Sequence, residues 1–352
     1  MSSNAYARSG VDQHAADRAV AALVGVLKTI DTGQPSRSVL ASGHYAAVLE
    51  IAPNLGIAVG TDGVGSKLIL AEQTGRYDTV GIDCVAMNVN DVVCVGAQPI
   101  ALLDYLAVER ADPDTMAQIG RGLKAGAEQA GVEIPGGEVA ILPELIRGHP
   151  SPNGFDLTAT CFGTVALDQM VTGDAIAPGD AIVGLPSSGL HSNSYSLARA
   201  ATKDLPLDGP FEDGTLADAL LAPTVIYVRA ALELLRSDIP VHGLAHITGG
   251  GLLNLLRLNE RVGFAIEDPL PVPPIIELVK RRGEVSDAEA WETFNMGCGF
   301  VAVVPAEHAD AAAALLSARH AGTRRIGTVT AAAGRVSAPG VTGTSAGLTP
   351  LE

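Results

Sequence analysis

Residues 60–67 read Gly-Thr-Asp-Gly-Val-Gly-Ser-Lys, or GTDGVGSK. The stretch nearly matches the phosphate-binding P-loop G-x-x-x-x-G-K-[ST], but Ser66 and Lys67 stand in reverse order and Asp62 places a negative charge inside the loop. Because it follows an expected strand and precedes an expected helix, its backbone amides can face an anion. A carboxylate beside phosphate usually holds Mg²⁺, which favours a metal-assisted phosphate site. The alternative is an ordinary strand-to-helix turn with Asp62 as the helix cap.

The composition sets the broad class of protein. A chain of 352 residues that is 47% hydrophobic predicts about two domains with a substantial core, of the α/β or α+β kind. The formal charge of −16 and the lack of any basic run argue against nucleic-acid binding and against attraction to an anionic membrane. An anionic substrate therefore needs locally placed cations, metal ions or backbone amides.

The cysteines and the hydropathy pattern indicate the compartment. Cys84, Cys94, Cys161 and Cys298 are scattered without C-x-x-C spacing, which predicts buried free thiols in a reducing cytosol. The N-terminal residues do not resemble a signal peptide, and no apolar run reaches the ~18 residues of a membrane span. We expect a cytoplasmic protein.

Hydrophobic periodicity and turn residues predict two domains and a tail. The expected domains are 1–168 and 169–340, with a boundary near the turn-rich stretch 173–180, and the Gly/Ala/Ser-rich end, 341–352, is expected to fray. The mixture of strands and helices predicts mixed sheets with some antiparallel pairing. The expected helices are 12–30, 66–73, 83–95, 113–130, 192–202, 222–236, 251–258 and 307–319; the expected strands are 46–52, 55–60, 99–108, 132–135, 155–167, 181–185, 262–266, 299–304 and 326–330.

The stretch GIDCVAMNVNDVVCVGA, residues 81–97, is an apolar helix that carries polar residues on one face. Asp83, Asn90 and Asp91 fall at positions i, i+7 and i+8. Buried carboxylates are costly unless they are paired or bound to a metal, so this face predicts a functional site. The alternative is a polar face that meets solvent.

Three glycine-rich or polar clusters give weaker signals. Glu138, in Gly136-Gly137-Glu138, is a candidate third metal carboxylate or part of a simple turn. His191 is a candidate acid, base or hydrogen-bond donor, while Ser192 or Asn193 can cap the helix that follows. The glycines of 248–251 can form a second phosphate nest or a hinge.

Taken in order, these stretches resemble the phosphoribosylformylglycinamidine cyclo-ligase family, also called aminoimidazole ribonucleotide synthetases. The resemblance runs from about residue 6 to about residue 330, and the pairing of HSN-x-YSL with D-G-V-G-[ST]-K is its most specific part. The motifs are YARSGVD (6–12), GTDGVGSK (60–67), GIDCVAMNVNDVV (81–93), LLDYLAV (102–108), GGE (136–138), LHSNSYSL (190–197), HITGGG (246–251) and TFNMGCGF (293–300).

The resemblance implies an ATP-dependent ring closure in purine biosynthesis. Phosphorylation of the formyl amide oxygen of formylglycinamidine ribonucleotide would make it a good leaving group, and the amidine-side nitrogen would then close the imidazole, with release of ADP and phosphate. Mg²⁺ would neutralise the transferring phosphoryl group. The implied fold is an N-terminal mixed sheet that forms a β-barrel across a homodimer, followed by a C-terminal α+β domain, with ATP and substrate between the two domains.

The resemblance also implies roles for individual residues. The expected metal ligands are Asp62, Asp91 and Glu138. The expected catalytic residues are His191, Asp91 and Lys67, of which Lys67 touches phosphate. The expected nucleotide contacts are Asp62, Gly63, Gly65, Ser66, Lys67, Asn90 and Asp91. The expected substrate contacts are His191, Ser192, Asn193, Thr248, Gly249, Gly250 and Gly251. Asn295 is expected to support the site.

The chain departs from the family pattern at several positions, among them Ser194 for a glycine and Ile141 for an acid. These departures leave open a catalytically silent nucleotide-binding paralogue. Other ATP-dependent phosphoryl-transfer enzymes of the same superfamily are a further alternative. Selenophosphate synthetase would need a cysteine before Cys84, and thiamine-monophosphate kinase usually lacks the HSN-x-YSL block.

Overall fold

The structure, a computed structural model, describes residues 13–40 and 43–351. The motif YARSGVD therefore lies outside the described residues. The helices are α2 (Gln13–Leu27), α3 (Leu68–Thr74), α4 (Asp78–Cys94), α5 (Pro113–Ala130), α6 (Tyr195–Thr202), α7 (Leu216–Leu220), α8 (Val228–Leu235), α9 (Pro274–Arg282), α10 (Asp287–Thr293) and α11 (Ala309–Ser317), with short 3₁₀ helices η1 (Gly65–Lys67), η2 (Leu167–Gln169), η3 (Gly251–Arg257) and η4 (Ala306–His308).

The strands form two large sheets and one small hairpin. They are β1 (Ala47–Ala52), β2 (Leu55–Gly63), β3 (Gln98–Val108), β4 (Glu133–Ile141), β5 (Phe155–Ala166), β6 (Ala181–Pro186), β7 (Pro210–Phe211), β8 (Gly214–Thr215), β9 (Gly243–His246), β10 (Gly263–Ile266), β11 (Cys298–Val304), β12 (Arg324–Thr330), β13 (Val336–Ala338), β14 (Val341–Thr344) and β15 (Gly347–Pro350).

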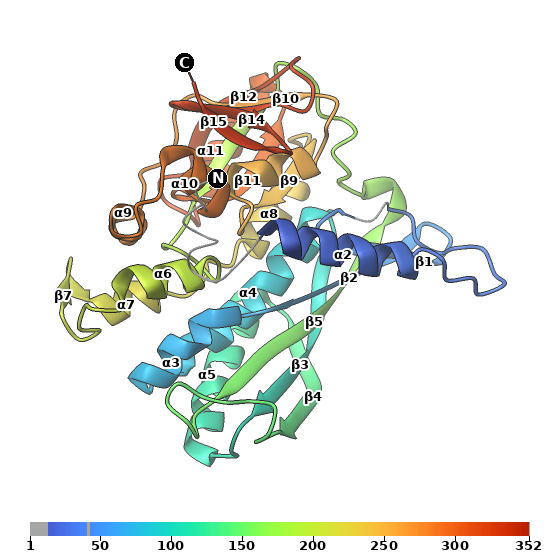
Figure 1. The fold of residues 1–352 in the computed structure, drawn as a ribbon. Helices are drawn as coiled ribbons and strands as arrows, with labels where there is room; N and C mark the ends of the chain where they lie inside the picture. The colour runs from blue at the N-terminus through green and yellow to red at the C-terminus, as the bar shows by residue number, and fades with distance from the viewer. Residues whose placement is uncertain (1–12, 41–42, 352) are drawn as a thin grey trace.

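The N-terminal part is a five-stranded sheet covered on one face. Its strand order is β1-β2-β5-β3-β4, and only the β3–β4 pair is parallel. Helix α4 packs on this sheet and α5 packs on α4 (Figure 1). The two helices approach closely because glycines meet there: a Cβ on Gly122 would lie 1.9 Å from the carbonyl oxygen of Asp78. The burial of α4 on all sides explains why its sequence is almost wholly apolar.

The C-terminal part is an eight-stranded sheet in the order β15-β14-β13-β10-β12-β6-β11-β9. Its central strands β6 and β11 are continuous apolar runs, as expected of strands that are covered on both faces. Helices α8 and α11 pack together, and α11 packs on β6 and β12 (Figure 1). The chain is thus a two-domain α/β protein with mixed sheets, as the sequence predicts at this level.

Many predicted elements are confirmed, and α5 has the predicted bounds. Its first turn is capped by Asp112, whose carboxylate accepts from the amide of Thr115, and Gly131 ends it in the left-handed conformation with φ 75°. The predicted helix 222–236 is too long, because α8 begins only at Val228. The segment predicted as helix 251–258 is the 3₁₀ helix η3. All four cysteines are buried and free, as expected.

The prediction that 341–352 is a frayed tail is wrong. Residues 341–344 and 347–350 are β14 and β15, which extend the large sheet. Val341 is fully buried and Leu348 is 8% exposed, so this hairpin contributes to the core. Small residues hid the pattern, since a strand of Thr and Gly has little hydrophobic alternation to detect. Among the described residues, no helix is long and apolar enough to cross a membrane.

Candidate active site

Asp62 and Asp91 approach each other where β2 meets α4. In the sheet, Asp62 lies opposite the buried Ala159, so its side chain is on the face that α4 covers. The side-chain amide of Asn88 holds the backbone of Asp62: its oxygen accepts from the amide of Asp62 at 2.9 Å, and its nitrogen donates to the carbonyl at 3.1 Å. Asp91 follows Asn88 by three residues and therefore shares its helix face. The two carboxylates are brought together by this one amide clamp.

The surroundings of the two carboxylates favour a bound cation. Burial raises the pKa of Asp62, and the negative charge of Asp91 raises it further, while hydrogen bonding from the amide of Gly63 opposes the shift. The side chain of Asp91 is 20% exposed, so a ligand can reach the pair. Two partly desolvated carboxylates of like charge fit a divalent cation such as Mg²⁺, which commonly takes one or two protein carboxylates and fills its remaining positions with phosphate and water.

We expect Asp62→Asn to stabilise the protein in the absence of divalent cations. Because the pKa of Asp62 is raised in the folded state, its contribution to stability is present at low pH and is lost as the pH rises through that raised pKa. A neutral asparagine removes this penalty and can still accept from the amide of Gly63. Thermal unfolding at pH 4 and pH 8 checks this: the variant should gain melting temperature at pH 8 only, and added Mg²⁺ should raise the melting temperature of the wild type alone. A variant less stable than the wild type at pH 8 would contradict the expectation.

Glu138 cannot join Asp62 and Asp91 of the same chain as a third metal ligand, contrary to the prediction. Gly63, Thr158, Tyr105 and Glu138 form one row across the sheet, on the face opposite to that of Asp62. Strands β2 and β4 are three strand spacings apart, or about 14 Å. In agreement, the described residues contain no group of three His, Cys, Asp or Glu side chains placed to hold a metal.

Lys67 is not free to bind phosphate, contrary to the prediction. Its side chain is fully buried, and its ammonium group lies 2.7 Å from Asp83 Oδ2, 3.0 Å from the carbonyl of His191 and 2.7 Å from the carbonyl of Ala222. The two carbonyl contacts are hydrogen bonds and the contact with Asp83 is a buried ion pair, so the ammonium group is already paired within the protein. Burial lowers the pKa of Lys67, and Asp83 opposes that shift. Lys67 thus ties the loop 60–67 to the C-terminal domain.

Asn90 likewise has a structural task in place of the predicted nucleotide contact. Its amide nitrogen donates to the carbonyl of Val225, and its oxygen accepts from the amide of Tyr227, both at 2.9 Å. Asp83, about two turns earlier on the same face of α4, accepts from the amide and the hydroxyl of Thr224, both at 2.7 Å. The polar face of α4 therefore divides: Asp83 and Asn90 bind the segment 222–227, and Asp91 remains for chemistry.

The predicted substrate residues after β6 lie at the domain junction. His191 has left-handed backbone, with φ 60°, and its side chain has no exposed surface, so it does not border open space in this structure. Burial lowers the pKa of His191 well below its ordinary value, which keeps the imidazole neutral. The hydroxyl of Ser192 lies 3.1 Å from that of Thr224. Ser194 adopts φ 64°, a conformation that explains why a glycine suits this position.

The glycine-rich turn after β9 lies beside Asn193. A Cβ on Gly249 would be 3.3 Å from Asn193 Oδ1, so the two predicted substrate segments meet. The turn is held by Asn254, whose side chain accepts from the amide of Thr248 at 2.8 Å. Gly251 has φ 50° and a Cβ there would lie 2.1 Å from the carbonyl oxygen of Trp291, so only glycine fits.

Ser66 and Asn295 each connect two segments of the site through hydrogen bonds. The hydroxyl of Ser66 is 3.4 Å from that of Ser196, which links the loop 60–67 to the start of α6. Asn295 is buried: its oxygen accepts from the Ser187 hydroxyl, and its nitrogen donates to the carbonyl of Gly189. Asn295 therefore holds the segment 187–189, which is consistent with its expected supporting role. Gly63 stays beside Asp62, while Gly65, with φ 70°, provides the turn into η1.

Sequence reasoning missed His246, a residue of the C-terminal domain that contacts Asp91. His246 is fully buried in β9, and its Nδ1 lies 2.9 Å from Asp91 Oδ1, so it joins the two domains at the acidic pair. Its place at the head of HITGGG was visible, but nothing in the sequence indicated that it meets a residue 155 positions earlier. The sequence likewise did not indicate that the Asn88 side chain binds the backbone of Asp62.

The described site and fold define a class of two-domain proteins. Residues 43–165 match the family model of the AIR synthase related protein N-terminal domain, and residues 177–338 match that of the C-terminal domain. Solved structures of this fold include the thiamine-monophosphate kinase of Stenotrophomonas maltophilia, with a TM-score of 0.61 and 23% identity over 87% of this chain and 92% of that one. The hydrogenase maturation protein HypE in complex with ATP gives a TM-score of 0.59 and 22% identity over 91% of this chain and 90% of that one.

Sequence relatives narrow the class to one family. The phosphoribosylformylglycinamidine cyclo-ligase of Methanothermobacter thermautotrophicus is 47% identical over 89% of this chain and 91% of that relative. The same enzyme of Thermococcus kodakarensis is 46% identical over 92% and 95%, respectively. The chain belongs to the phosphoribosylformylglycinamidine cyclo-ligase family, which comprises ATP-dependent ligases of purine biosynthesis.

Proposed function

We propose that this chain closes the imidazole ring of 5-aminoimidazole ribonucleotide from formylglycinamidine ribonucleotide, with ATP converted to ADP and phosphate. The observation that carries the proposal is the Asp62–Asp91 pair at the junction where the 189–194 and 248–251 segments meet. The pair has the composition and burial suited to Mg²⁺, and Mg²⁺ with ATP would supply the charge neutralisation that phosphoryl transfer requires.

Each set of residues has a separate task in this proposal. Asp62 and Asp91 hold the cation, and Asn88 keeps Asp62 in register with Asp91. The backbone amides of Gly249 and Gly250 and the side chain of Asn193 bind the substrate phosphate and ribose, since a glycine turn exposes amide donors to an anion. The amide of Gly251 instead closes the turn, because it donates to the carbonyl of Thr248 at 2.9 Å. His191 acts as a neutral hydrogen-bonding group, because burial keeps its imidazole uncharged. Lys67, Asp83 and Asn90 hold the two domains in place and do not touch ATP.

A coupled assay tests this proposal. Protein, ATP, Mg²⁺ and formylglycinamidine ribonucleotide should yield ADP and 5-aminoimidazole ribonucleotide in equal amounts, followed by ADP coupling and by the colour reaction of the aminoimidazole. The control omits the ribonucleotide and should show little ADP. ATP binding without any imidazole product would support the silent paralogue instead.

The proposal includes a homodimer formed through the open face of the N-terminal sheet. Four large apolar side chains lie exposed on that face, on β1, β2 and β3: Leu49 37%, Leu55 39%, Leu103 43% and Tyr105 40%. An uncovered apolar sheet face is unusual for a monomer. A second copy packed face to face would cover it and complete a barrel, and Glu138 lies on the same face.

We also propose the division into domains 1–168 and 169–340 that the sequence predicts, with β14 and β15 added to the second domain.

We expect Leu103→Asp to convert the dimer into monomers. The charge would be buried at the centre of the proposed interface, and an unpaired buried charge is strongly unfavourable. Size-exclusion chromatography with light scattering should give the dimer mass for the wild type and the monomer mass of 35.9 kDa for the variant. Leu145→Asp is the matched control, because Leu145 is 79% exposed but lies outside the sheet. A wild type that is monomeric would overturn the proposal.

A further inference from the structure

A cavity of about 510 Å³ lies between α3, α6 and the loop that follows α6. Cavities of this size commonly hold small ligands. Helix α6 packs on η1, which leads directly into α3, so the two helices start close together and both contribute to the lining. None of the lining residues belongs to the site proposed above for Mg²⁺, ATP and substrate.

One face of α6 gives the cavity its positive charge. Arg199 and Lys203 both line it, and their i, i+4 spacing places them side by side on the helix surface. Two like charges at this spacing repel each other. Among the described residues that line the cavity, none is acidic, although the chain as a whole has a formal charge of −16. A bound anion would relieve the repulsion.

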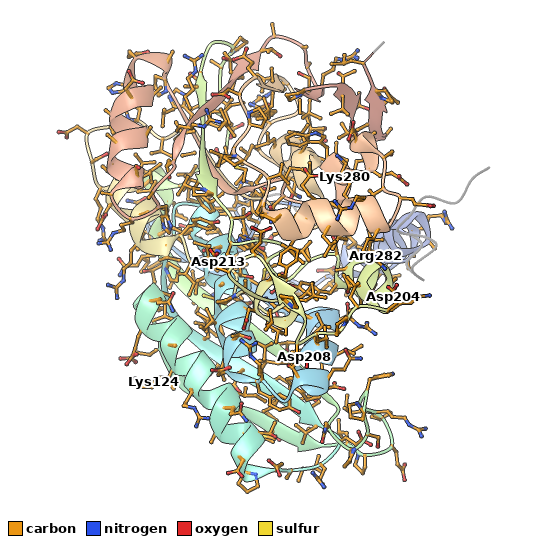
Figure 2. The ribbon with its side chains drawn as sticks, turned by 90° about the vertical axis from the view of Figure 1, so that its left-hand side faces the viewer. Lys124, Asp204, Asp208, Asp213, Lys280 and Arg282 are labelled. Carbon is orange, nitrogen blue, oxygen red and sulfur yellow. The ribbon has the colours of Figure 1, made fainter. Side chains whose placement is uncertain are left out.

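The guanidinium group of Arg199 has no partner within residues 13–40 and 43–351: no hydrogen bond or ion pair holds it, although the side chain is half-buried. Burial lowers the pKa of Arg199, and the charge of Glu72 opposes that shift. Glu72 itself is buried and accepts from the amide of His149. Asp204, in the loop after α6, pairs with Arg282 (Figure 2). A partly buried cation without a counter-ion costs free energy, so Arg199 is available for an anion.

The rest of the lining suits an organic ligand. Leu70, Leu205 and Leu207 form an apolar part of the wall. Gln73 and Ser196 add an amide and a hydroxyl, which both donate and accept hydrogen bonds. A ligand that matches this lining has an anionic end, hydroxyl groups and a flat ring.

We propose that this cavity binds a nucleoside monophosphate. The phosphate would lie between the guanidinium group of Arg199 and the ammonium group of Lys203, since both form charge-assisted hydrogen bonds with phosphate. The ribose hydroxyls would pair with Gln73 and Ser196, and the base would lie on the three leucines. This second nucleotide site does not depend on the proposed ring closure.

The bound nucleotide would connect two segments that lead out of the proposed active site. Helix α3 follows the loop 60–67, and α6 follows the segment 189–194. The hydroxyls of Ser66 and Ser196 lie 3.4 Å apart where these segments meet. A ligand that contacts both helices would stabilise this junction, so it should raise the melting temperature of the protein.

Calorimetry with AMP as the probe tests the proposal. The titration is done without divalent cations, so that the acidic pair of Asp62 and Asp91 does not attract the phosphate. AMP should bind with a dissociation constant below about 1 mM. Adenosine lacks the phosphate and ribose 5-phosphate lacks the base, so each should bind at least about 10-fold more weakly. Adenosine or ribose 5-phosphate that binds as tightly as AMP would overturn the proposal.

Two variants alter the cavity in different ways. Arg199→Met removes one cation, and Ala200→Trp fills the cavity while it keeps both cations, because Ala200 is exposed on α6 and lines the cavity. Each should weaken AMP binding at least about 10-fold. Arg281→Met is the matched control, because Arg281 is exposed on α9 and does not line the cavity, and its affinity should stay within about 2-fold. Circular dichroism checks the fold of all three.

Hydrogen exchange locates the bound AMP. Exchange of backbone amides should slow in residues 68–75 and 196–207. Slowing at 248–251 alone would overturn the proposal and assign the binding to the glycine turn of the proposed substrate site. Unchanged affinity in both Arg199→Met and Ala200→Trp would overturn it as well. The coupled assay for the imidazole product is a separate measurement, so either proposal can fail without the other.

Discussion

Asp91→Asn is expected to reduce turnover by at least about 100-fold while leaving the fold intact. The substitution removes one of the two charges that hold the proposed Mg²⁺, and metal ions supply several kcal/mol of transition-state stabilisation in phosphoryl transfer. The asparagine oxygen can still accept from His246 Nδ1–H, so the contact between the domains is kept. Steady-state assays over a range of Mg²⁺ concentrations, with circular dichroism and thermal unfolding alongside, measure both parts of the prediction.

The matched control is Asp180→Asn. Asp180 is buried and pairs with His242, as Asp91 pairs with His246, but it lies outside the site. This variant should retain wild-type turnover in its folded fraction. Unchanged activity in Asp91→Asn would refute the metal assignment. An unfolded Asp91→Asn protein would show that the carboxylate is structural.

Lys67→Met is expected to cost about 3–5 kcal/mol of unfolding free energy, because it leaves the fully buried Asp83 without its cationic partner. It also leaves the carbonyls of His191 and Ala222 without their donor. Urea unfolding followed by circular dichroism measures the loss. Adding Asp83→Asn should restore part of the stability, since the double variant no longer buries an unpaired charge.

Lys124→Met provides the comparison for Lys67→Met. Lys124 lies on the outer surface of α5 (Figure 2), where it pairs with Glu128 and its side chain is 70% exposed. Removal of an exposed pair should change stability by less than about 1 kcal/mol. The Michaelis constant for ATP, measured on the folded fraction of Lys67→Met, should stay close to the wild-type value. A large increase in that constant would instead support a phosphate contact by Lys67.

Many helices and strands were predictable from the sequence, because their positions depend on signals from residues close together in the chain. Asp112, Pro113 and Gly131 set the bounds of α5 by capping and by backbone preference. The alternating and continuous apolar runs identified β3, β5, β6 and β11. The C-terminal hairpin was not predicted, since its Val341 and Leu348 become part of the core only when β13 and the rest of the sheet are present.

The sequence alone determined the family, because a run of motifs in fixed order is specific without any coordinates, and it predicted Asp62 and Asp91 as candidate metal ligands. Only the tertiary structure decided which of the other polar residues are left for chemistry. Lys67, Asp83 and Asn90 have the residue types of a nucleotide site, but each is fully buried and hydrogen-bonded to segments across the domain junction. His246 looked like part of a glycine-rich turn, and contact with Asp91 makes it part of the site. GTDGVGSK therefore contributes one proposed metal ligand, Asp62, and one structural cation, Lys67. The fold turns the Asp62 side chain toward Asp91 and the Lys67 side chain into the core.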